Sequence, residues 1–242
     1  MKNEKYLITV ANTKGGSGKT TIALNLASGF AVKGVPVALL DNHTQQSAHK
    51  MWDRANDESF SLPFNTIPFI VRNNKYLGGM QQAYEEVVAD LDEKLIIIDT
   101  PTRDSDQSLL ELFFFSDLVL VPFMSWDLAN LDAMEDFIVL LNAANDARLA
   151  SSGTPLNIKI VLSQHQSHRP STQYTVQKLE ELLDKWKLKK GLQIPILSSS
   201  IDKTAEFVTS SCTRRTVFHY PKAKMARLMI ECLMTEISLD MQ

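Results

Sequence analysis

Three glycines and two lysines lie within eight residues near the start of the chain, and their spacing suits the binding of phosphate groups. Gly15, Gly16 and Gly18 can adopt backbone angles that are closed to other residues, so main-chain N–H groups can approach an anion closely. Lys19 can then reach the terminal phosphates of a nucleotide, and the Thr20 hydroxyl can bind Mg²⁺. The segment predicted to bind phosphate comprises Lys14, Gly15, Gly16, Ser17, Gly18, Lys19, Thr20 and Thr21.

The elements on either side of this segment have the order that phosphate binding requires. Residues 6–11 form a short apolar run rich in β-branched and aromatic side chains, which favours a buried strand. Residues 22–32 place apolar side chains at helical spacing, and the helix is expected to begin near Lys19. Its free N–H groups and positive dipole end would then face the same anion.

Two aspartates follow further strand-like runs. Residues 35–40 and 95–98 are apolar and short, and they are followed by Asp41 and Asp99. Parallel strands deliver such carboxylates to the carboxyl edge of the sheet, where open α/β folds bind their ligands. For Asp41 the alternative is a residue that only caps the strand end.

The alternation of strands and helices predicts an α/β fold, with one domain over residues 1–242 built on a doubly wound, mostly parallel sheet flanked by helices. Residues 64–71 would lie at an edge, because Pro68 cannot donate to a central ladder. Asp127 is expected to cap the helix that follows it. The other expected strands are 118–122, 158–163 and 194–197, and the other expected helices are 80–91, 128–144, 172–188 and 223–239.

The last helix is predicted to pack on the sheet through an apolar face. We place on that face Met225, Leu228, Met229, Cys232, Leu233, Glu236 and Ile237. The alternative is a helix lying in a membrane interface. Glu236 and Asp240 argue against it, because anionic lipid favours basic residues.

Composition limits the function classes. The net charge of −3 excludes a chain that is basic throughout, so any nucleic-acid contact must come from a local patch. Cys212 and Cys232 show no C-x-x-C spacing, which argues against a disulfide scaffold or structural zinc. No signal-peptide pattern and no run of membrane-spanning length is present, so we expect a cytoplasmic protein without integral membrane association.

The phosphate segment departs from the common G-x-x-x-x-G-K-[ST] pattern, because Thr13 stands where its first glycine is expected and Lys14 follows. This resembles the deviant Walker A motif, K-G-G-x-G-K-[ST], of the ParA/MinD family of P-loop ATPases, which position DNA or other cargo. The resemblance implies ATP and Mg²⁺ as cofactors. It also implies a catalytic role for Lys14 across a dimer interface, on the partner subunit's nucleotide. The alternative for Lys14 is an exposed loop charge.

The resemblance extends to two further loops. Asp41, with Gln45, Ser47 and Trp52, resembles the family's switch I loop, but His43 stands where its second aspartate is expected. That aspartate is thought to position the attacking water. A neutral imidazole can accept a proton, so His43 either replaces the aspartate or has no catalytic task. Asp99 resembles the switch II aspartate, which holds Mg²⁺ through water, although residues 102–104 depart from the pattern.

Residues 201–227 carry six cationic side chains against two acidic ones, in an otherwise acidic chain. We therefore predict nonspecific DNA binding by Lys203, Arg214, Arg215, Lys222 and Lys224. The lysines at 185–190 are assigned instead to ordinary chemistry at a helix end, since a glycine follows them. Residues 164–166 correspond to the segment that contacts adenine in the family.

Taken together, the resemblance implies a ParA-like ATPase that binds MgATP, forms a nucleotide-sandwich homodimer and binds DNA. A ParB-like or cargo-adaptor protein would stimulate hydrolysis, and the protein would be cytoplasmic and associated with the nucleoid. The alternatives are an ATP-dependent scaffold with little hydrolysis, a MinD-like membrane-associated ATPase and a dethiobiotin-synthetase-like ligase. A nitrogenase-iron-protein-like reductase is set aside, because Cys212 and Cys232 lie too late in the chain to bind its cluster.

Overall fold

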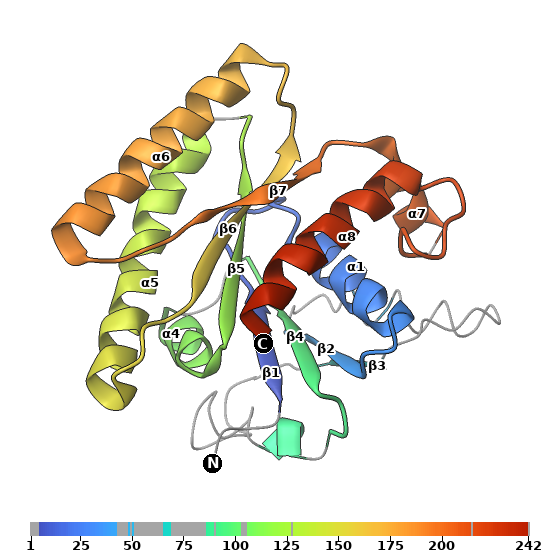
Figure 1. Ribbon diagram of the computed structural model, residues 1–242, viewed down its shortest axis with the longest axis horizontal. Helices are drawn as coiled ribbons and strands as arrows, with labels where there is room; N and C mark the ends of the chain where they lie inside the picture. Colours follow the sequence, from blue (N-terminus) through green and yellow to red (C-terminus); the bar gives the residue numbers. More distant parts are fainter. Residues whose placement is uncertain are drawn as a thin grey trace.

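The computed structural model describes residues 5–42, 48, 50, 65–68, 86–89, 91–102, 106–126, 128–213 and 215–241 (Figure 1). Its centre is a seven-stranded sheet with the order β3-β2-β4-β1-β5-β6-β7, in which every neighbouring pair is parallel. The prediction of a doubly wound parallel sheet is confirmed. The strands are β1 (Tyr6–Val10), β2 (Val37–Asp41), β3 (Asn65–Pro68), β4 (Leu95–Asp99), β5 (Leu118–Met124), β6 (Ile158–His165) and β7 (Ile196–Asp202).

Helices cover both faces of the sheet (Figure 1). One face carries α1 (Lys19–Val32), α7 (Ala205–Cys212) and α8 (Lys224–Ser238), with a short 3₁₀ turn, η1 (Leu239–Met241), after α8. The other face carries α4 (Asp106–Phe115), α5 (Ala129–Ser152) and α6 (Pro170–Lys190). Because successive side chains of a strand point to opposite faces, each central strand supplies both cores. In β4, for example, Ile97 faces α1 and α8, whereas Ile96 faces the other layer.

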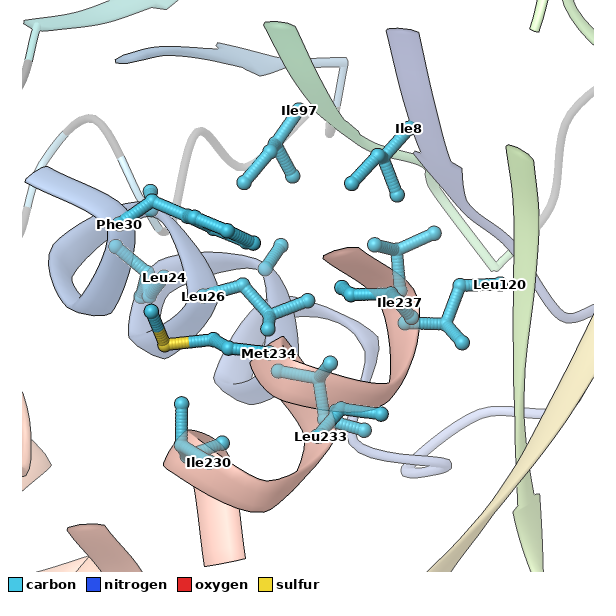
Figure 2. Close-up of a cluster of buried hydrophobic side chains, with 14 of the residues drawn as sticks. Ile8, Leu24, Leu26, Phe30, Ile97, Leu120, Ile230, Leu233, Met234 and Ile237 are labelled. Atoms are coloured by element: carbon cyan, nitrogen blue, oxygen red, sulfur yellow. The ribbon is translucent and has the colours of Figure 1, made fainter. Parts of the chain in front are cut away.

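The core between the sheet, α1 and α8 is mostly apolar (Figure 2). Ile8, Ile97 and Leu120 of the sheet point towards Phe30 of α1 and Ile237 of α8. The two helices approach closely at Gly29, where an added Cβ atom would lie 2.3 Å from the sulfur of Met234. A glycine in mid-helix costs about 1 kcal/mol against alanine, and here it lets the two helices pack.

The predicted packing of α8 on the sheet is confirmed, and the predicted face is right in part, because Leu233 and Ile237 are buried. Met225 and Leu228 are 56% and 51% exposed, and Cys232 is also exposed. The buried residues are Ala226, Ile230, Leu233, Met234 and Ile237. Apolar residues lie on both sides of this helix, so spacing alone allowed two faces. The close approach at Gly29, which is remote in sequence, selects one of them.

Other boundaries differ in instructive ways. Strand β7 runs to Asp202, beyond the predicted 194–197, because its serines at an edge of the sheet break the apolar signal. Helix α5 continues to Ser152 and ends at Gly153, which has a φ of 69°. Its N-cap is Leu128, without a side-chain cap, and not Asp127, which lies outside the described residues. Strand β3 occupies an edge, as Pro68 indicated. Of the helix predicted at 80–91, residues 86–89 are described and helical.

Both cysteines are exposed and free. Among the described helices, none is both long and apolar enough to cross a bilayer.

Candidate phosphate and metal site

The predicted phosphate loop lies at the carboxyl edge of the sheet, between β1 and α1. Gly16 and Gly18 have φ angles of 74° and 91°, a left-handed conformation that side chains with a Cβ atom rarely adopt. No side chain caps the start of α1, which begins at Lys19. Its first N–H groups are therefore available to an anion in the loop.

Three polar side chains, two of them from β6, hold this loop in place. The Asn12 side-chain amide donates to the Pro122 carbonyl (2.7 Å), and its oxygen accepts from the Lys14 N–H (2.8 Å). At the end of β6, Ser163 Oγ donates to the Ser17 carbonyl (2.8 Å) and Gln164 Nε2 to the Gly16 carbonyl (2.6 Å). Gln164 has a φ of 49°, so the strand ends in a locally unfavourable turn that these contacts maintain.

Sequence reasoning missed two of these supports, Asn12 and Ser163. A usable signal was present, because both are polar residues at the ends of apolar strands, as Asp99 is. Residues 164–166 were assigned as a group from the family, and the structure separates them. Gln164 reaches the phosphate loop, whereas the ring nitrogen Nδ1 of His165 lies 2.8 Å from Ser125 Oγ.

Lys19 is almost fully buried, with 5% of its surface exposed. Its Nζ donates long hydrogen bonds to the Lys14 carbonyl (3.4 Å) and to Thr102 Oγ1 (3.3 Å). Burial lowers the pKa of Lys19, and the charge of Asp99 opposes that shift. A buried ammonium with such weak partners is well placed to gain from an incoming phosphate oxygen.

The two predicted aspartates lie side by side, because Asp41 and Asp99 are register partners on β2 and β4. Both are fully buried, and neither Asp99 oxygen has a hydrogen-bond partner within the described part of the chain. Burial raises the pKa of Asp99 to about 7, and the Asp41 charge adds to this. The nearby Thr20 hydroxyl and Lys19 ammonium act in the opposite direction.

An orphaned buried carboxylate beside a threonine hydroxyl fits Mg²⁺, which prefers oxygen ligands and is commonly held by one or two carboxylates together with substrate phosphates. His43, the other predicted catalytic residue, lies outside the described residues, so its role stays a prediction.

A cavity of about 440 Å³ opens over the loop, a size that suits a small ligand such as a nucleotide. Its floor is formed by residues 16–22, with Thr102, Ser163 and Gln164 beside them. The far wall comes from the end of β7 and the start of α7, which sequence reasoning had not assigned to this site. These wall residues are Ile201, Asp202, Lys203, Thr204, Phe207 and Val208.

The structure describes four of the five residues predicted to bind DNA. Lys203 lines the cavity and lies 6.0 Å from the centre of the Trp126 ring. Arg215, Lys222 and Lys224 lie between α7 and the first turn of α8. Arg214 lies outside the described residues.

A glycine-rich loop joining the first strand to the first helix of a parallel sheet, with a buried aspartate ending the adjacent strand, defines a P-loop nucleotide-binding protein. Within that class, the chain belongs to the CobQ/CobB/MinD/ParA nucleotide binding domain family (CbiA), whose model matches residues 8–217. The resemblance found in the sequence is thereby confirmed.

Two curated relatives are maintenance of carboxysome distribution proteins A. The one from Halothiobacillus neapolitanus is 22% identical over 205 residues, which cover 85% of this chain and 83% of the relative. The one from Gloeobacter kilaueensis is 30% identical over 117 residues, so that match spans about half (48%) of either protein.

Solved structures confirm the fold. A putative plasmid partition protein from Borrelia burgdorferi bound to AMPPNP has a TM-score of 0.65 at 16% identity and covers 96% of this chain and 99% of its own. An ATP complex of a Cyanothece McdA variant has a TM-score of 0.67, with 16% identity over 95% of this chain and 96% of its own. Cobyrinic acid a,c-diamide synthase from Mycobacterium smegmatis, with an ATP analogue and magnesium, also has a TM-score of 0.67, with 16% identity over 95% of this chain and 94% of its own. The predicted cofactors, ATP and Mg²⁺, agree with these ligands, whereas the fold alone does not separate cargo positioning from ligase chemistry.

Proposed function

We propose that this protein is a ParA-like ATPase that binds MgATP, dimerises around the nucleotide and positions DNA or another cargo. The observation that carries the proposal is the sequence KGGSGKTT at residues 14–21, folded as a phosphate loop opposite the orphaned carboxylate of Asp99. A motif match and a buried acid on the adjacent strand thus support the same ligand, a nucleotide with its metal ion.

In this proposal the loop N–H groups and the start of α1 hold the phosphates, and Lys19 leaves its weak partners to bind the terminal phosphate. Thr20, and Asp99 through water, would hold Mg²⁺, which when bound neutralises charge developing on the phosphate oxygens. Asp41, beside Asp99, belongs to the same acidic edge of the site.

Lys14 is proposed to act on the nucleotide of a partner subunit. Its main chain is fixed, because its N–H donates to Asn12 and its carbonyl accepts from Lys19. Among the described residues, no hydrogen bond or ion pair holds its ammonium group, so that group can serve a partner.

The proposed cargo activity rests on the relatives and on charge. The names of the two curated relatives refer to carboxysome distribution, and the Borrelia protein is described as a putative plasmid partition protein. For this chain we propose nonspecific contacts to DNA phosphates by Lys203, Arg214, Arg215, Lys222 and Lys224, with a ParB-like or cargo-adaptor protein stimulating hydrolysis.

The test is fluorescence anisotropy of a random DNA duplex against salt, with and without a slowly hydrolysed ATP analogue. If ATP pairs two subunits, the number of phosphate contacts doubles to about five and the log–log salt slope steepens to about −4.5. Arg215→Glu should abolish this binding and leave ATP affinity unchanged, whereas Lys189→Glu at the end of α6 should have a smaller effect. Equally tight DNA binding with and without nucleotide would contradict the proposal that ATP controls DNA binding. No DNA binding in any condition would contradict the proposed DNA role.

A further inference from the structure

A second cavity, of about 420 Å³, lies beside the nucleotide cavity at the same edge of the sheet. One wall is the loop between β6 and α6, which contributes His168 and Arg169. The other wall contains Lys203, Thr204 and Val208, which line both cavities. A ligand in the second cavity would therefore touch a wall that the nucleotide also touches.

The charged lining of this second cavity is cationic. Arg169 and Lys203 carry full positive charges, and the remaining ionisable residue is His168. Within the described ranges of the chain, no carboxylate forms an ion pair with Arg169 or Lys203. Because these cations have no carboxylate partner there, the electrostatic potential around this cavity is expected to be positive and to attract anions, although the chain as a whole has a net charge of −3.

Two helices also begin at this cavity. Arg169 is the N-cap of α6 and Thr204 is the N-cap of α7, and neither helix has a side-chain cap. The Thr204 hydroxyl oxygen is buried and has no hydrogen-bond partner among the described residues. The start of α7 adds N–H donors and positive potential to the arginine and lysine, a combination that suits a phosphate group. The start of α6 adds less, because Pro170 has no N–H and the Thr172 N–H donates to the Arg169 carbonyl.

The two walls are fixed relative to each other before any ligand binds. The Lys203 N–H donates to the His165 carbonyl (3.2 Å), which ties the end of β7 to the end of β6. The Arg169 N–H donates to the Gln166 carbonyl (2.9 Å), and Gln173 Nε2 donates to the Ser167 carbonyl (3.2 Å). A preformed cationic cavity loses less entropy when it orders around a ligand than flexible lysines would.

We propose that this cavity binds a backbone phosphate of DNA, with Arg169 as its main contact and with Lys203 and the start of α7 as further contacts. The inference rests on the proposed function and adds Arg169 and His168 to the residues that contact DNA. A polymer is favoured over a small phosphate compound, because His168, Arg169 and Lys203 are exposed and a single phosphate would be held by few contacts. The shared wall of Lys203, Thr204 and Val208 would link DNA binding to nucleotide binding.

The test measures how Arg169→Ala changes the affinity for a random DNA duplex and its salt dependence, in the presence of a slowly hydrolysed ATP analogue. Affinity should fall roughly tenfold, and the log–log salt slope should decrease by about one per subunit. Arg169→Lys should keep most of the slope, because the charge remains. Lys189→Ala, an exposed cation at the other end of the same helix, is the matched control and should change the slope less.

Two further readouts separate the possible failures. ATP affinity, measured with a fluorescent nucleotide, should be unchanged in Arg169→Ala, because Arg169 does not line the nucleotide cavity. If wild-type protein binds DNA and Arg169→Ala binds it with the same salt slope, this inference alone is overturned. If wild-type protein does not bind DNA, the proposed function is overturned. Thermal stabilisation by inorganic phosphate that depends on Arg169, without any change in DNA affinity, would assign the cavity to small phosphates and overturn the DNA assignment.

Discussion

At the scale of single residues, Asp99 shows how a proposed functional site is kept at a cost to stability. Burial of the Asp99 carboxyl group, next to Asp41, disfavours its charged form and raises its pKa to about 7. Between pH 3.8 and 7 the folded state then binds a proton that the unfolded state has released. The stability of the nucleotide-free protein should therefore fall as pH rises across that interval.

Asp99→Asn should remove this cost. At pH 8 the nucleotide-free variant should be more stable than wild type by a few kcal/mol, roughly 1.4 kcal/mol for each unit of pKa shift, and the difference should vanish near pH 4. The same variant should lose Mg²⁺-dependent ATP hydrolysis. Urea unfolding from pH 4 to 8 and a phosphate-release assay measure both effects. Asp184→Asn, an exposed site on α6, is the control, and a variant less stable than wild type at pH 8 would contradict the account.

The sequence was informative about residues whose chemistry is local. The phosphate loop and Asp99 could be predicted, because a glycine pattern or a strand followed by an acid is visible within ten residues. The contacts that β6 makes to the loop could not be predicted in the same way. Ser163 and Gln164 contact it from almost 150 positions away, so only the strand order brings them there.

At the scale of elements, α8 stabilises the exposed edge of the sheet. Strand β7 is an edge strand, and the N–H groups of Ser198 and Ser199 donate to the two carboxylate oxygens of Glu236, each at 2.8 Å. Partial burial would raise the pKa of Glu236, but these two N–H groups and the Lys159 charge lower it overall. A lowered pKa means that the contact stabilises the fold above the ordinary pKa of 4.5 and is lost as pH falls below it.

Glu236→Gln should destabilise the protein by about 1 kcal/mol at pH 7, because one charge-assisted pair of hydrogen bonds becomes neutral at a partly exposed site. The difference from wild type should shrink below about pH 4.5, the ordinary value for this group, once Glu236 itself becomes protonated. Denaturant midpoints at pH 7 and pH 3.5 measure it. Glu231→Gln, on the same helix and paired with Arg227 near the surface, should change stability less. A pH-independent loss in Glu236→Gln would show that packing, and not charge, is responsible.

Elements with one clear apolar pattern were predicted well, and those with two were not. Strands β1 and β4 and helix α1 begin or end within about one residue of the predicted positions, because each has a single apolar run with turn residues beside it. The face of α8 was misassigned in part, because Met225 and Leu228 are apolar yet exposed. The strand β7 was predicted too short, because its edge position tolerates serines.

At the scale of the whole molecule, the proposed dimer follows from two lysines with different surroundings in one loop. Lys19 is buried and turned towards its own loop, where it donates to the Lys14 carbonyl. The Lys14 main chain is fixed by Asn12, and its ammonium group has no ion pair within the described part of the chain. Two ammonium groups on one triphosphate would repel each other. A division of roles, one within the subunit and one across the interface, is therefore the favourable arrangement.

Lys19→Ala should abolish nucleotide binding, whereas Lys14→Ala should bind ATP nearly as tightly as wild type but lose the ATP-dependent dimer and turnover. Light scattering with a slowly hydrolysed ATP analogue measures the dimer, and a fluorescent nucleotide measures affinity. Lys33→Ala, which removes an exposed cation at the other end of α1, should affect neither. If Lys14→Ala still dimerises with ATP as wild type does, Lys14 has no role in trans. The positive charge that the partner's nucleotide requires would then have to come from another element.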